Sequence, residues 1–373
     1  MRFGDLVKIS KGKKPVEIRE VALPGDRRLL QIEDLRDGAI PRYCPAARNE
    51  VVADEDDLVL AWDGANAGIS SHGLKGAAGS TLAVLRPLLP AQVHTPYLAQ
   101  FLKSKQGYLR STCKGATVPH IDPAAIAGLE VELPALPEQC RIAAILDQAE
   151  KQRGKAETAL VLVESMRMSI AQSFFDAHKT FPMVALAELA ERVVVGYVGP
   201  SSSHIVDDGV PFLRTGNIGP GEIIEKDLLQ IDHKLHGELK KSQLHAGDVV
   251  LRRHIDDRIR SAIIPAHLDG SNCANIIVVR PSERVRAEIV TSYLGLAETQ
   301  QFLVGRRVGS AQSVVNTTEL KKLPVPDLPT DVQVRYCEIV RDVRRNRDRI
   351  ARLCLQLGQL FTSLQSRAFS GQL

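Results

Sequence analysis

Apolar residues recur every seven positions in two segments of the chain, residues 138–176 and 332–370. This spacing is typical of long helices that pack against a second helix along one apolar seam. Because the segments have equal length and the same pattern, we expect two long helices that pair antiparallel as a coiled coil. The recurring positions are Ile142, Ala149, Ala156, Val163 and Ile170 in the first segment, and Tyr336, Val343, Ile350, Leu357 and Leu364 in the second.

A second set of seam positions is expected three residues after the first set. Both segments carry an amide side chain there, at Gln152 and Asn346. A buried amide in such a seam fixes the register of the helices at a cost in stability. The alternative is that both amides face solvent, and the two interpretations are equally open. The other members of the second set are Ile145, Ala159 and Met166, and Ile339, Leu353 and Leu360.

The ends of both segments carry helix start and stop signals. Thr330 and Gln333 have the spacing of a capping box, Pro137 suits a first helical turn, and Gly371 suits a helix stop. At 1.5 Å per residue, about 39 residues span roughly 58 Å. We therefore expect the paired helices to act as a spacer between two other domains.

Outside these segments, short apolar runs alternate with turn residues, which is typical of β-strands. Each half adds a short helix, at residues 97–104 and about 284–303. The pattern predicts an α/β (α+β) domain in each half. The predicted strands are residues 29–32, 58–62 and 82–85, and residues 212–214, 249–251 and 276–279. The predicted organisation is a domain at 1–134, a helical region at 135–180, a second domain at 181–328 and a second helical region at 329–373.

The two halves of the chain repeat one another. Gln139 corresponds to Gln333 (333 − 139 = 194), and Phe175 corresponds to Phe369 at the same offset. The same offset joins the VLRP run of the first half to the VVRP run of the second. A fixed offset across strand and helix indicates an internal pseudo-twofold repeat.

Composition narrows the class of protein. A hydrophobic share of 44% and a charged share of 25% are typical of a globular protein. No apolar run approaches the roughly 20 residues that span a bilayer, and the first residues are not an apolar signal segment, so we expect a cytoplasmic protein. The six cysteines form no Cys-x-x-Cys pair, which favours reduced thiols. The net charge of +4 permits nucleic-acid binding without requiring it.

Basic and amide side chains gather in the predicted loops of both domains. Arginine and lysine suit phosphate and guanine, and asparagine and glutamine suit adenine. Each residue alone is more simply a solvated surface group, but the set favours DNA binding. The candidates are Lys11, Lys13, Lys14, Trp62, Asn66, Lys75 and Lys114 in the first domain, and Arg214, Arg252, Arg253, His254, Arg258, Arg260, Arg306, Arg307, Gln312 and Asn316 in the second.

Sequence motifs of common catalytic sites are absent. The chain has no phosphate-binding loop, no Gly-x-Gly-x-x-Gly helix start, no His-Glu-x-x-His and no Gly-x-Ser-x-Gly. His233 and His236 lack an apparent third metal ligand. We therefore expect no catalytic residue and no metal site.

The helical motifs resemble those of type I restriction-modification specificity subunits (S subunits). They are LPALPEQCRIAAILDQAE at 133–150 and LFTSLQSRAFSGQL at 360–373, and the resemblance extends over the whole chain. It implies a non-catalytic subunit in which each domain recognises one half of a bipartite DNA target. It also implies that the helical regions dock two methyltransferase subunits. The implied partner-binding candidates are Glu138, Gln139, Arg141, Gln333, Arg335, Phe175 and Phe369.

The resemblance further implies restriction and translocase subunits in the same ATP-dependent endonuclease and adenine methyltransferase complex. S-adenosylmethionine, ATP and magnesium would belong to those partners, and none to this chain. The alternative function is a helical scaffold that joins two ligand- or protein-binding domains without touching DNA. Salt-dependent binding to duplex DNA distinguishes the two functions.

Overall fold

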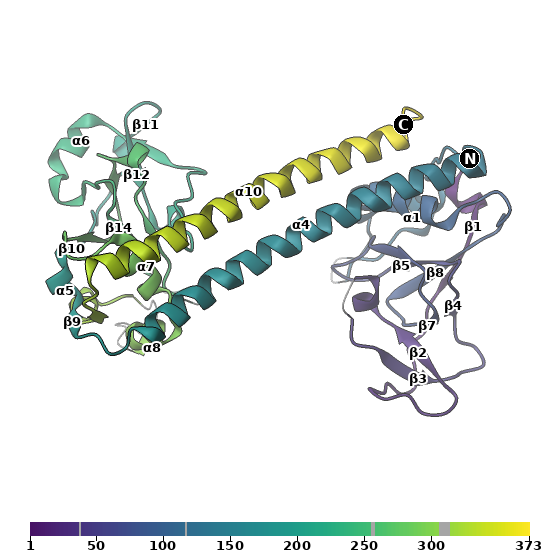
Figure 1. The fold of residues 1–373 in the computed structure, drawn as a ribbon. Helices are drawn as coiled ribbons and strands as arrows, with labels where there is room; N and C mark the ends of the chain where they lie inside the picture. Colours follow the sequence, from purple (N-terminus) through teal and green to yellow (C-terminus); the bar gives the residue numbers. More distant parts are fainter. Residues whose placement is uncertain (37–38, 116–117, 255–257, 306–313) are drawn as a thin grey trace. The chain divides into compact units, whose positions relative to one another are not determined.

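The computed structural model describes residues 1–36, 39–115, 118–254, 258–305 and 314–373. Two compact units divide the chain, and each is described by itself (Figure 1). Unit 1 comprises Met1–Glu157 with Ala351–Leu373, and unit 2 comprises Thr158–Ile350. The two long helices, α4 (Leu136–Ala177) and α10 (Thr330–Ala368), each contribute one half to each unit.

Unit 1 contains two four-stranded sheets and short helices. The first sheet has the order β1-β8-β5-β6 and is antiparallel, whereas the second, β3-β2-β7-β4, includes the parallel pair β2 and β7. The predicted strands of the first half are present as β2, β5 and β8. The strands are β1 (Val7–Lys11), β2 (Asp26–Leu30), β3 (Arg42–Pro45), β4 (Val52–Ala53), β5 (Leu58–Ala61), β6 (Ser70–His72), β7 (Gly76–Ala78) and β8 (Leu82–Pro87); the helices are η1 (Phe3–Asp5), η2 (Ile32–Leu35), α1 (Thr95–Ser104), α2 (Gln106–Ser111) and α3 (Pro123–Ala127).

Unit 2 has two sheets of similar design, β10-β17-β14-β15 and β11-β13-β12-β16, and a small pair of β9 and β18. The single helix predicted at 284–303 is instead two helices that Gly295 separates. The strands are β9 (Met183–Ala185), β10 (Ala190–Val195), β11 (Ile205–Val206), β12 (Val210–Leu213), β13 (Leu229–Ile231), β14 (Val249–Arg252), β15 (Ser261–Ile263), β16 (Asn272–Cys273), β17 (Ile276–Pro281) and β18 (Pro324–Pro326); the helices are α5 (Leu186–Leu189), η3 (Ser202–His204), η4 (Thr215–Asn217), α6 (His233–Glu238), η5 (Lys240–Ser242), η6 (Ala266–Leu268), α7 (Ala287–Leu294), α8 (Ala297–Gly305) and α9 (Thr317–Lys321).

Every residue of β5, and every residue of β14 before Arg252, is apolar, because both faces of these central strands are covered. In β5, Leu58 and Leu60 face the core that includes the helices, whereas Val59 faces the core shared with the second sheet. In β14, Leu251 and Val250 divide in the same way between two cores. Each unit therefore has a sheet between a helical layer and a second sheet.

Paired side chains repeat between the units and confirm the predicted internal repeat. Arg86 in β8 donates two hydrogen bonds to the buried Asp57, at 2.9 and 2.5 Å. Arg280 in β17 donates two to the buried Asp248, at 2.7 and 2.8 Å. Each bidentate pair ties one central strand to the turn before its neighbour. The first sheets of the two units have the same strand order. In the second sheets β3-β2-β7 corresponds to β13-β12-β16, and the fourth strands, β4 and β11, lie at opposite edges.

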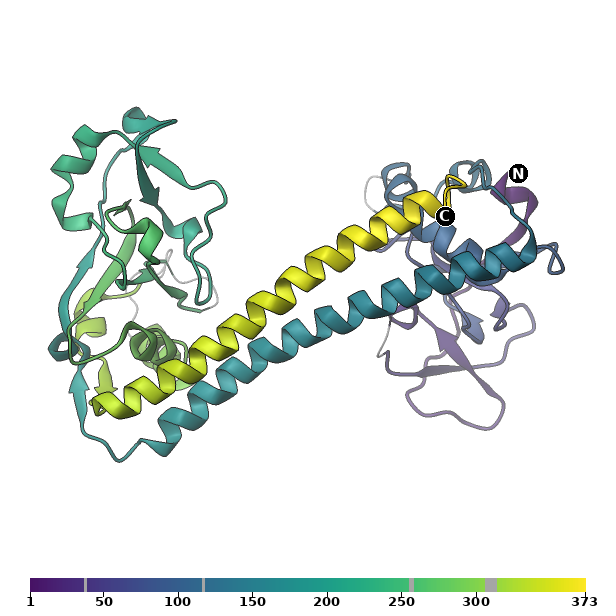
Figure 2. The same ribbon diagram turned by 45° about the horizontal axis from the view of Figure 1, so that its top comes forward.

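The halves of α4 and α10 pair antiparallel within each unit, as predicted (Figure 2). In unit 1, the Arg153 guanidinium lies over the Phe361 ring at 4.9 Å. In unit 2, the rings of Phe174 and Tyr336 stack at 4.2 Å. In both units an early position of one helix meets a late position of the other, which requires opposite directions.

The predicted second set of seam positions is displaced by one residue from the observed set, so this prediction is wrong. The first set is buried or half-buried throughout, but Gln152, Asn346 and Leu360 are exposed. The residues that follow four positions after the first set, such as Leu146 and Phe361, are buried instead. Positions three and four residues away lie on either side of the same helix face, so spacing alone does not choose between them. Both amides therefore face solvent.

Candidate nucleic-acid and partner interfaces

The loop after β5 in unit 1 is held by backbone hydrogen bonds to a segment far along the chain. Trp62 O accepts from Ile121 N at 2.9 Å, and Gly64 N donates to Pro119 O at 2.8 Å. Asp63 forms a β-bridge with His120. These bonds thus hold the loop after β5 at the end of the first sheet.

The loop after β14 in unit 2 is held at the corresponding place. Arg253 O accepts from Val315 N at 2.8 Å, and His254 forms a β-bridge with Val314. Val315 lies 194 residues after Ile121 (315 − 121 = 194) and Arg253 lies 191 residues after Trp62 (253 − 62 = 191), so an equivalent backbone bond repeats in the second unit. The two units therefore present equivalent loops that carry different side chains.

Polar side chains gather around the unit 1 loop. Lys11 pairs with Asp63 at 2.9 Å, and Arg36 donates to Asn66 Oδ1 at 2.6 Å. Lys114, which pairs with Asp122 at 2.8 Å, adjoins the same segment through its bridge with His120. Sequence reasoning predicted Lys11, Asn66 and Lys114 here but missed the exposed Arg36 and His120. Only the long-range pairing brings those two to the loop.

In unit 2, arginines surround the corresponding loop. Arg252 Nε donates to Ile218 O at 2.8 Å, and its backbone N donates to Arg260 O. Arg258 is exposed, and Arg253 is half-buried. Arg252 is therefore held in place by a backbone contact, and Arg258 lies at the surface of the unit.

Arg214 lies apart, at a polar recess beside the second sheet of unit 2. It is exposed, and its backbone N donates to the buried Asn217 at 2.9 Å. The recess is also lined by Lys226 and Asn275, which sequence reasoning missed. Asn275 adopts a φ of 54°, a conformation uncommon for residues other than glycine.

Two candidates have structural roles instead. Trp62 is only 7% exposed and belongs to the core of unit 1. Asn316 is the N-cap of α9, where its side chain accepts from Thr318 N at 2.9 Å. Burial therefore argues against Trp62 as a contact with DNA, whereas contact of the half-buried Asn316 with DNA stays a prediction. The candidates Arg306, Arg307 and Gln312 lie outside the described residues.

The remaining lysines of unit 1 are exposed at other places. Lys13 and Lys14 follow β1, and Lys75 precedes β7 and pairs with Asp54 at 3.2 Å. Among the described residues of unit 1, no side-chain bond or ion pair joins them to the loop after β5. They are surface charges whose contact with DNA stays a prediction.

Gln139 and Gln333, predicted to bind a partner, are buried and fully hydrogen-bonded. Gln139 accepts from His94 N at 2.9 Å and donates to Gln92 O and Pro134 O, both at 2.8 Å. Gln333 makes the same three bonds in unit 2, to the backbone of Arg286, Arg284 and Leu328. Each therefore ties the start of a long helix to the segment before a short helix. The predicted capping box of Gln333 with Thr330 is not formed, because this amide is used elsewhere.

The two phenylalanines are also core residues. Phe175 packs on Tyr293, with ring centroids 5.0 Å apart, and Phe369 packs on Tyr97 at 5.4 Å. Arg141 and Arg335 are exposed and pair with acidic residues one helical turn earlier, Glu138 and Asp331. Of the predicted partner contacts, only the charged side chains are thus accessible.

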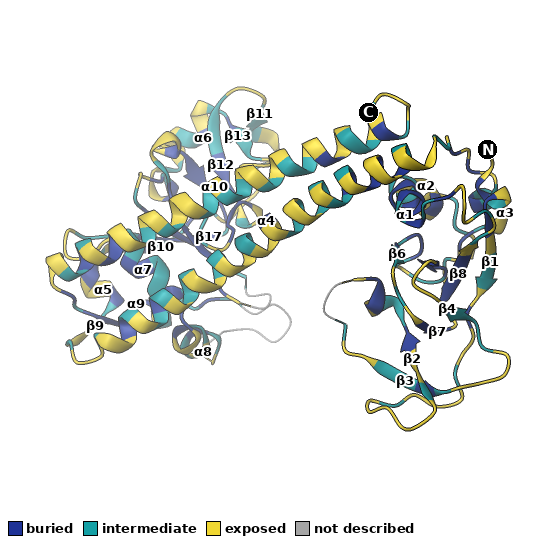
Figure 3. Cartoon of the chain, turned by 45° about the vertical axis from the view of Figure 1, so that its right-hand side comes forward, coloured by how far each residue is buried: buried dark blue, intermediate teal, exposed yellow. Residues whose placement is uncertain are grey.

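Several apolar side chains of the long helices are exposed, and Figure 3 shows exposed residues along both helices. Such side chains are uncommon on a helix that faces only water, and they indicate protein contacts where they gather. The exposed apolar side chains are Val161, Leu162 and Met166 on α4, and Ile339, Leu353, Leu355 and Leu360 on α10. Four of them, Met166, Ile339, Leu353 and Leu360, were predicted as seam positions.

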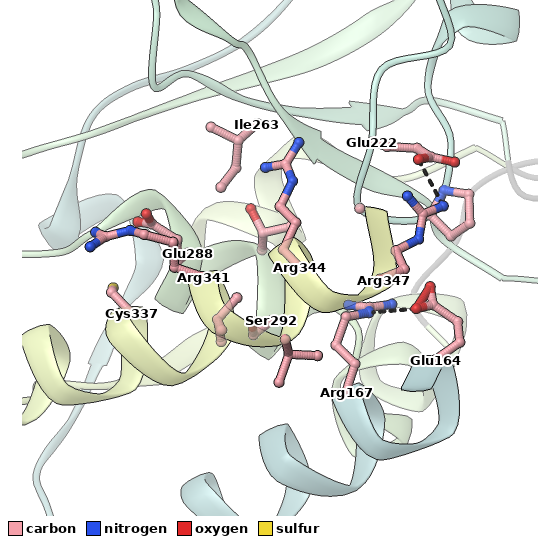
Figure 4. Close-up of a pocket in the computed structure, with 15 residues that line it drawn as sticks. Glu164, Arg167, Glu222, Ile263, Glu288, Ser292, Cys337, Arg341, Arg344 and Arg347 are labelled. Carbon is pink, nitrogen blue, oxygen red and sulfur yellow. Dashed lines mark hydrogen bonds and ion pairs between the residues drawn. The ribbon is translucent and has the colours of Figure 1, made fainter. Parts of the chain in front are cut away.

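A crevice in unit 2 lies beside the long helices and is rimmed by charged side chains (Figure 4). Arg167 pairs with Glu164 at 3.4 Å, and Arg347 pairs with Glu222 at 2.9 Å. Burial raises the pKa of the Cys337 thiol on its wall to about 12. This thiol is therefore protonated at neutral pH and is a poor nucleophile.

The described part of the chain contains no group of three or more His, Cys, Asp or Glu side chains placed to hold a metal ion. Among the same residues, no helix is both long and apolar enough to cross a membrane.

The sequence of this chain is similar to those of known proteins. A family model for the type I restriction modification DNA specificity domain matches residues 1–160. Residues 1–160, less than half of this chain, are thus similar to this family. A curated relative, the type I restriction enzyme MjaVIII specificity subunit of Methanocaldococcus jannaschii, is 29% identical over 265 residues. The alignment covers 67% of this chain and 62% of that protein, which is less than two thirds of its length.

Solved structures share the fold of this chain over nearly its whole length. The type I restriction-modification system S subunit from M. genitalium is 14% identical, with a TM-score of 0.64 over 99% of this chain and 95% of that one. A chain from a study of complex assembly and conformational transition of the type I R-M system is 15% identical, with a TM-score of 0.58 over 100% and 97%. The similarity extends the fold beyond the residues that the family model matches.

Proposed function

We propose that this chain is the sequence-specific DNA-binding specificity subunit of a type I restriction-modification complex. Each unit recognises one half of a bipartite DNA target, and the long helices dock methyltransferase subunits. The chain itself provides recognition and no catalytic residue. S-adenosylmethionine, ATP and magnesium act in the methyltransferase and restriction subunits.

One observation carries this proposal most directly. The loops after β5 and β14 are held by the same backbone bonds, Ile121 N to Trp62 O and Val315 N to Arg253 O, yet their side chains differ. A repeated frame with different polar side chains suits the recognition of two different short sequences. A scaffold that held two copies of one binding site would favour similar side chains at these loops.

The exposed apolar side chains of α4 and α10 support docking of large protein subunits. Leu355 is 70% exposed and Val161 is 69% exposed. Burial of such side chains against a partner contributes about 25 cal/mol per Å² of apolar surface removed from water. This surface replaces the two buried glutamines as the proposed contact region.

Methylation sequencing of cells that express the chain with a type I methyltransferase subunit tests the proposal. We expect methylated adenines within a bipartite motif. Exchange of residues 181–328 for those of a relative should change one half of the motif and leave the other half unchanged. A motif that changed in both halves would contradict one-unit-one-half recognition. Absence of salt-dependent duplex binding by the purified complex would favour a scaffold that does not touch DNA.

A further inference from the structure

The middle of α10 carries a line of exposed arginines on the helix face opposite the seam. Arg341, Arg345, Arg349 and Arg352 are all exposed. At 3.6 residues per turn they fall within a sector of roughly 80° and extend over roughly 16 Å. The seam residues Val343 and Ile350 lie on the other side of the helix. We call these four residues the arginine ladder.

The corresponding face of α4 has no such line. The positions 194 residues earlier hold Asp147, Lys151, Lys155 and Thr158. Over the twelve residues 341–352, α10 has six arginines and two aspartates, whereas residues 147–158 of α4 have three acidic and three basic residues. Because seam and cores repeat between the two halves, packing alone does not account for this difference in charge.

The ladder is weakly neutralised by the protein itself. Arg345 contacts Asp342 at 3.3 Å, in a pair whose side chains are both about 70% exposed. Among the residues that the structure describes, no carboxylate lies within ion-pair distance of Arg341, Arg349 or Arg352. Exposed pairs of this kind contribute little stability. The ladder therefore has no evident role in holding the fold.

The chemistry of the ladder suits a phosphate backbone. All of its members are arginines, whose planar guanidinium donates two parallel hydrogen bonds to a phosphate. Four residues of helix rise about 6 Å, close to two steps of about 3.4 Å along one DNA strand. An acidic protein segment would need a series of carboxylates at the same spacing, whereas DNA supplies phosphates at regular intervals.

We propose that the arginine ladder of α10 is a second DNA-contacting surface, which binds backbone phosphates without reading bases. The inference rests on the proposed function, because it assumes that the complex binds duplex DNA. It adds a sequence-independent contact on a helix to the recognition loops of the two units. It also makes the two long helices unequal, with α10 and not α4 as the one that contacts DNA.

A matched pair of variants tests the ladder. Arg345→Gln/Arg349→Gln removes two of its charges, and Lys151→Gln/Lys155→Gln removes two charges at the equivalent positions of α4. The complex with its methyltransferase subunits is titrated with mixed-sequence duplex DNA at several salt concentrations. Each phosphate contact contributes roughly 0.9 to the slope of log affinity against log salt. We expect the α10 variant to flatten that slope by roughly two and the α4 variant to leave it unchanged.

Three results would overturn the inference. An unchanged slope in the α10 variant would mean that the ladder does not touch DNA. Equal flattening in both variants would mean that net charge matters and not the ladder. An unchanged slope with loss of the methyltransferase subunits from the purified complex would identify a protein-docking face. If the unaltered complex shows no salt-dependent binding at all, the proposed function fails together with this inference. Unchanged circular dichroism and melting temperature confirm that each variant is folded.

Discussion

Units 1 and 2 are two versions of one design, and their differences separate framework from function. Both have a buried glutamine at the start of a long helix, a bidentate Arg–Asp pair beside a central strand, and a strand-end loop held by a backbone bond. These features repeat because each satisfies buried polar groups that the fold itself creates. The side chains that point outward from the same loops do not repeat, which is expected if each unit recognises its own ligand.

The long helices carry different side chains at two equivalent positions, which is a second difference between the units. In unit 1, Glu150 accepts from Lys103 at 2.6 Å and from Gln100 at 3.0 Å, and Asp147 accepts from Gln100 at 2.7 Å. In unit 2 the equivalent positions are Arg341 and Arg344, which line the open crevice of Figure 4. At these two positions, acidic side chains of α4 contact α1 in unit 1, whereas basic side chains of α10 line a crevice in unit 2.

The largest expected difference between the units is at the helix seam. Phe361 is buried in unit 1, and its equivalent on α4 in unit 2 is Arg167, which pairs with a half-exposed glutamate. Phe361→Ala should lower the free energy of unfolding by about 3 kcal/mol, because it leaves a cavity. Arg167→Ala should cost less than about 1 kcal/mol. Chemical denaturation measures both. The neighbour variant Leu360→Ala is the control, and a cost equal to that of Phe361→Ala would refute the assigned seam.

The Arg–Asp pairs should differ in strength although their geometry is the same. The Arg280 side chain is 22% exposed, and that of Arg86 is 57% exposed. Arg280→Ala leaves Asp248 buried without its partner and should cost about 3 kcal/mol. Water can reach Asp57 more easily, so we expect Arg86→Ala to cost about 1 kcal/mol. Urea titration of both variants checks the order, and the reverse order would show that burial of the guanidinium does not set the strength.

The buried glutamines should be equivalent. Gln139→Ala and Gln333→Ala each leave three backbone groups without a partner, and we expect each to cost about 2 kcal/mol. Thermal unfolding of both variants measures this. A large loss of stability in one variant and none in the other would show that the two glutamines are not equivalent, although their bonding is the feature in which the units correspond most closely. Restored stability in either position by glutamate would indicate that only the accepting oxygen matters.

The smallest expected effect is a pH dependence confined to unit 1. Burial alone would raise the pKa of Glu150, but the hydrogen bond and charge of Lys103 and the bond from Gln100 lower the pKa below its ordinary value of 4.5. A lowered folded-state pKa contributes stability above 4.5 that is lost as the pH falls through the folded value. The advantage of the unaltered chain over Glu150→Gln should therefore shrink in acid, by less than about 1 kcal/mol. Melting temperatures of the two proteins at neutral and acidic pH measure it, and a constant difference would mean that Glu150 is not charged when folded.

The sequence by itself determined the elements whose signal is local. The heptads of α4 and α10, the apolar runs of β5 and β14, and the repeat of 194 residues are all visible along the chain, because helix and strand periodicity is set by neighbouring residues. The same signals predicted the loops after β5 and β14 as the places for basic side chains. Arg258 lies after β14, and Lys11 at the end of β1 pairs with Asp63 of the loop after β5; contact of either residue with DNA stays a prediction.

Only the tertiary structure decided what the individual side chains do. Gln139 and Gln333 have the polarity and helix position of surface contacts, but their bonding partners lie 45 and 47 residues away, so their burial is invisible locally. Trp62 became core for the same reason, and Arg36 joined Asn66 across 30 residues, whereas the cap that Asn316 forms with Thr318 is a local contact. The choice between Leu360 and Phe361 at the seam depended on which side of α10 meets α4 within unit 1. A helix face is a local property, whereas the surface that covers it belongs to another part of the chain.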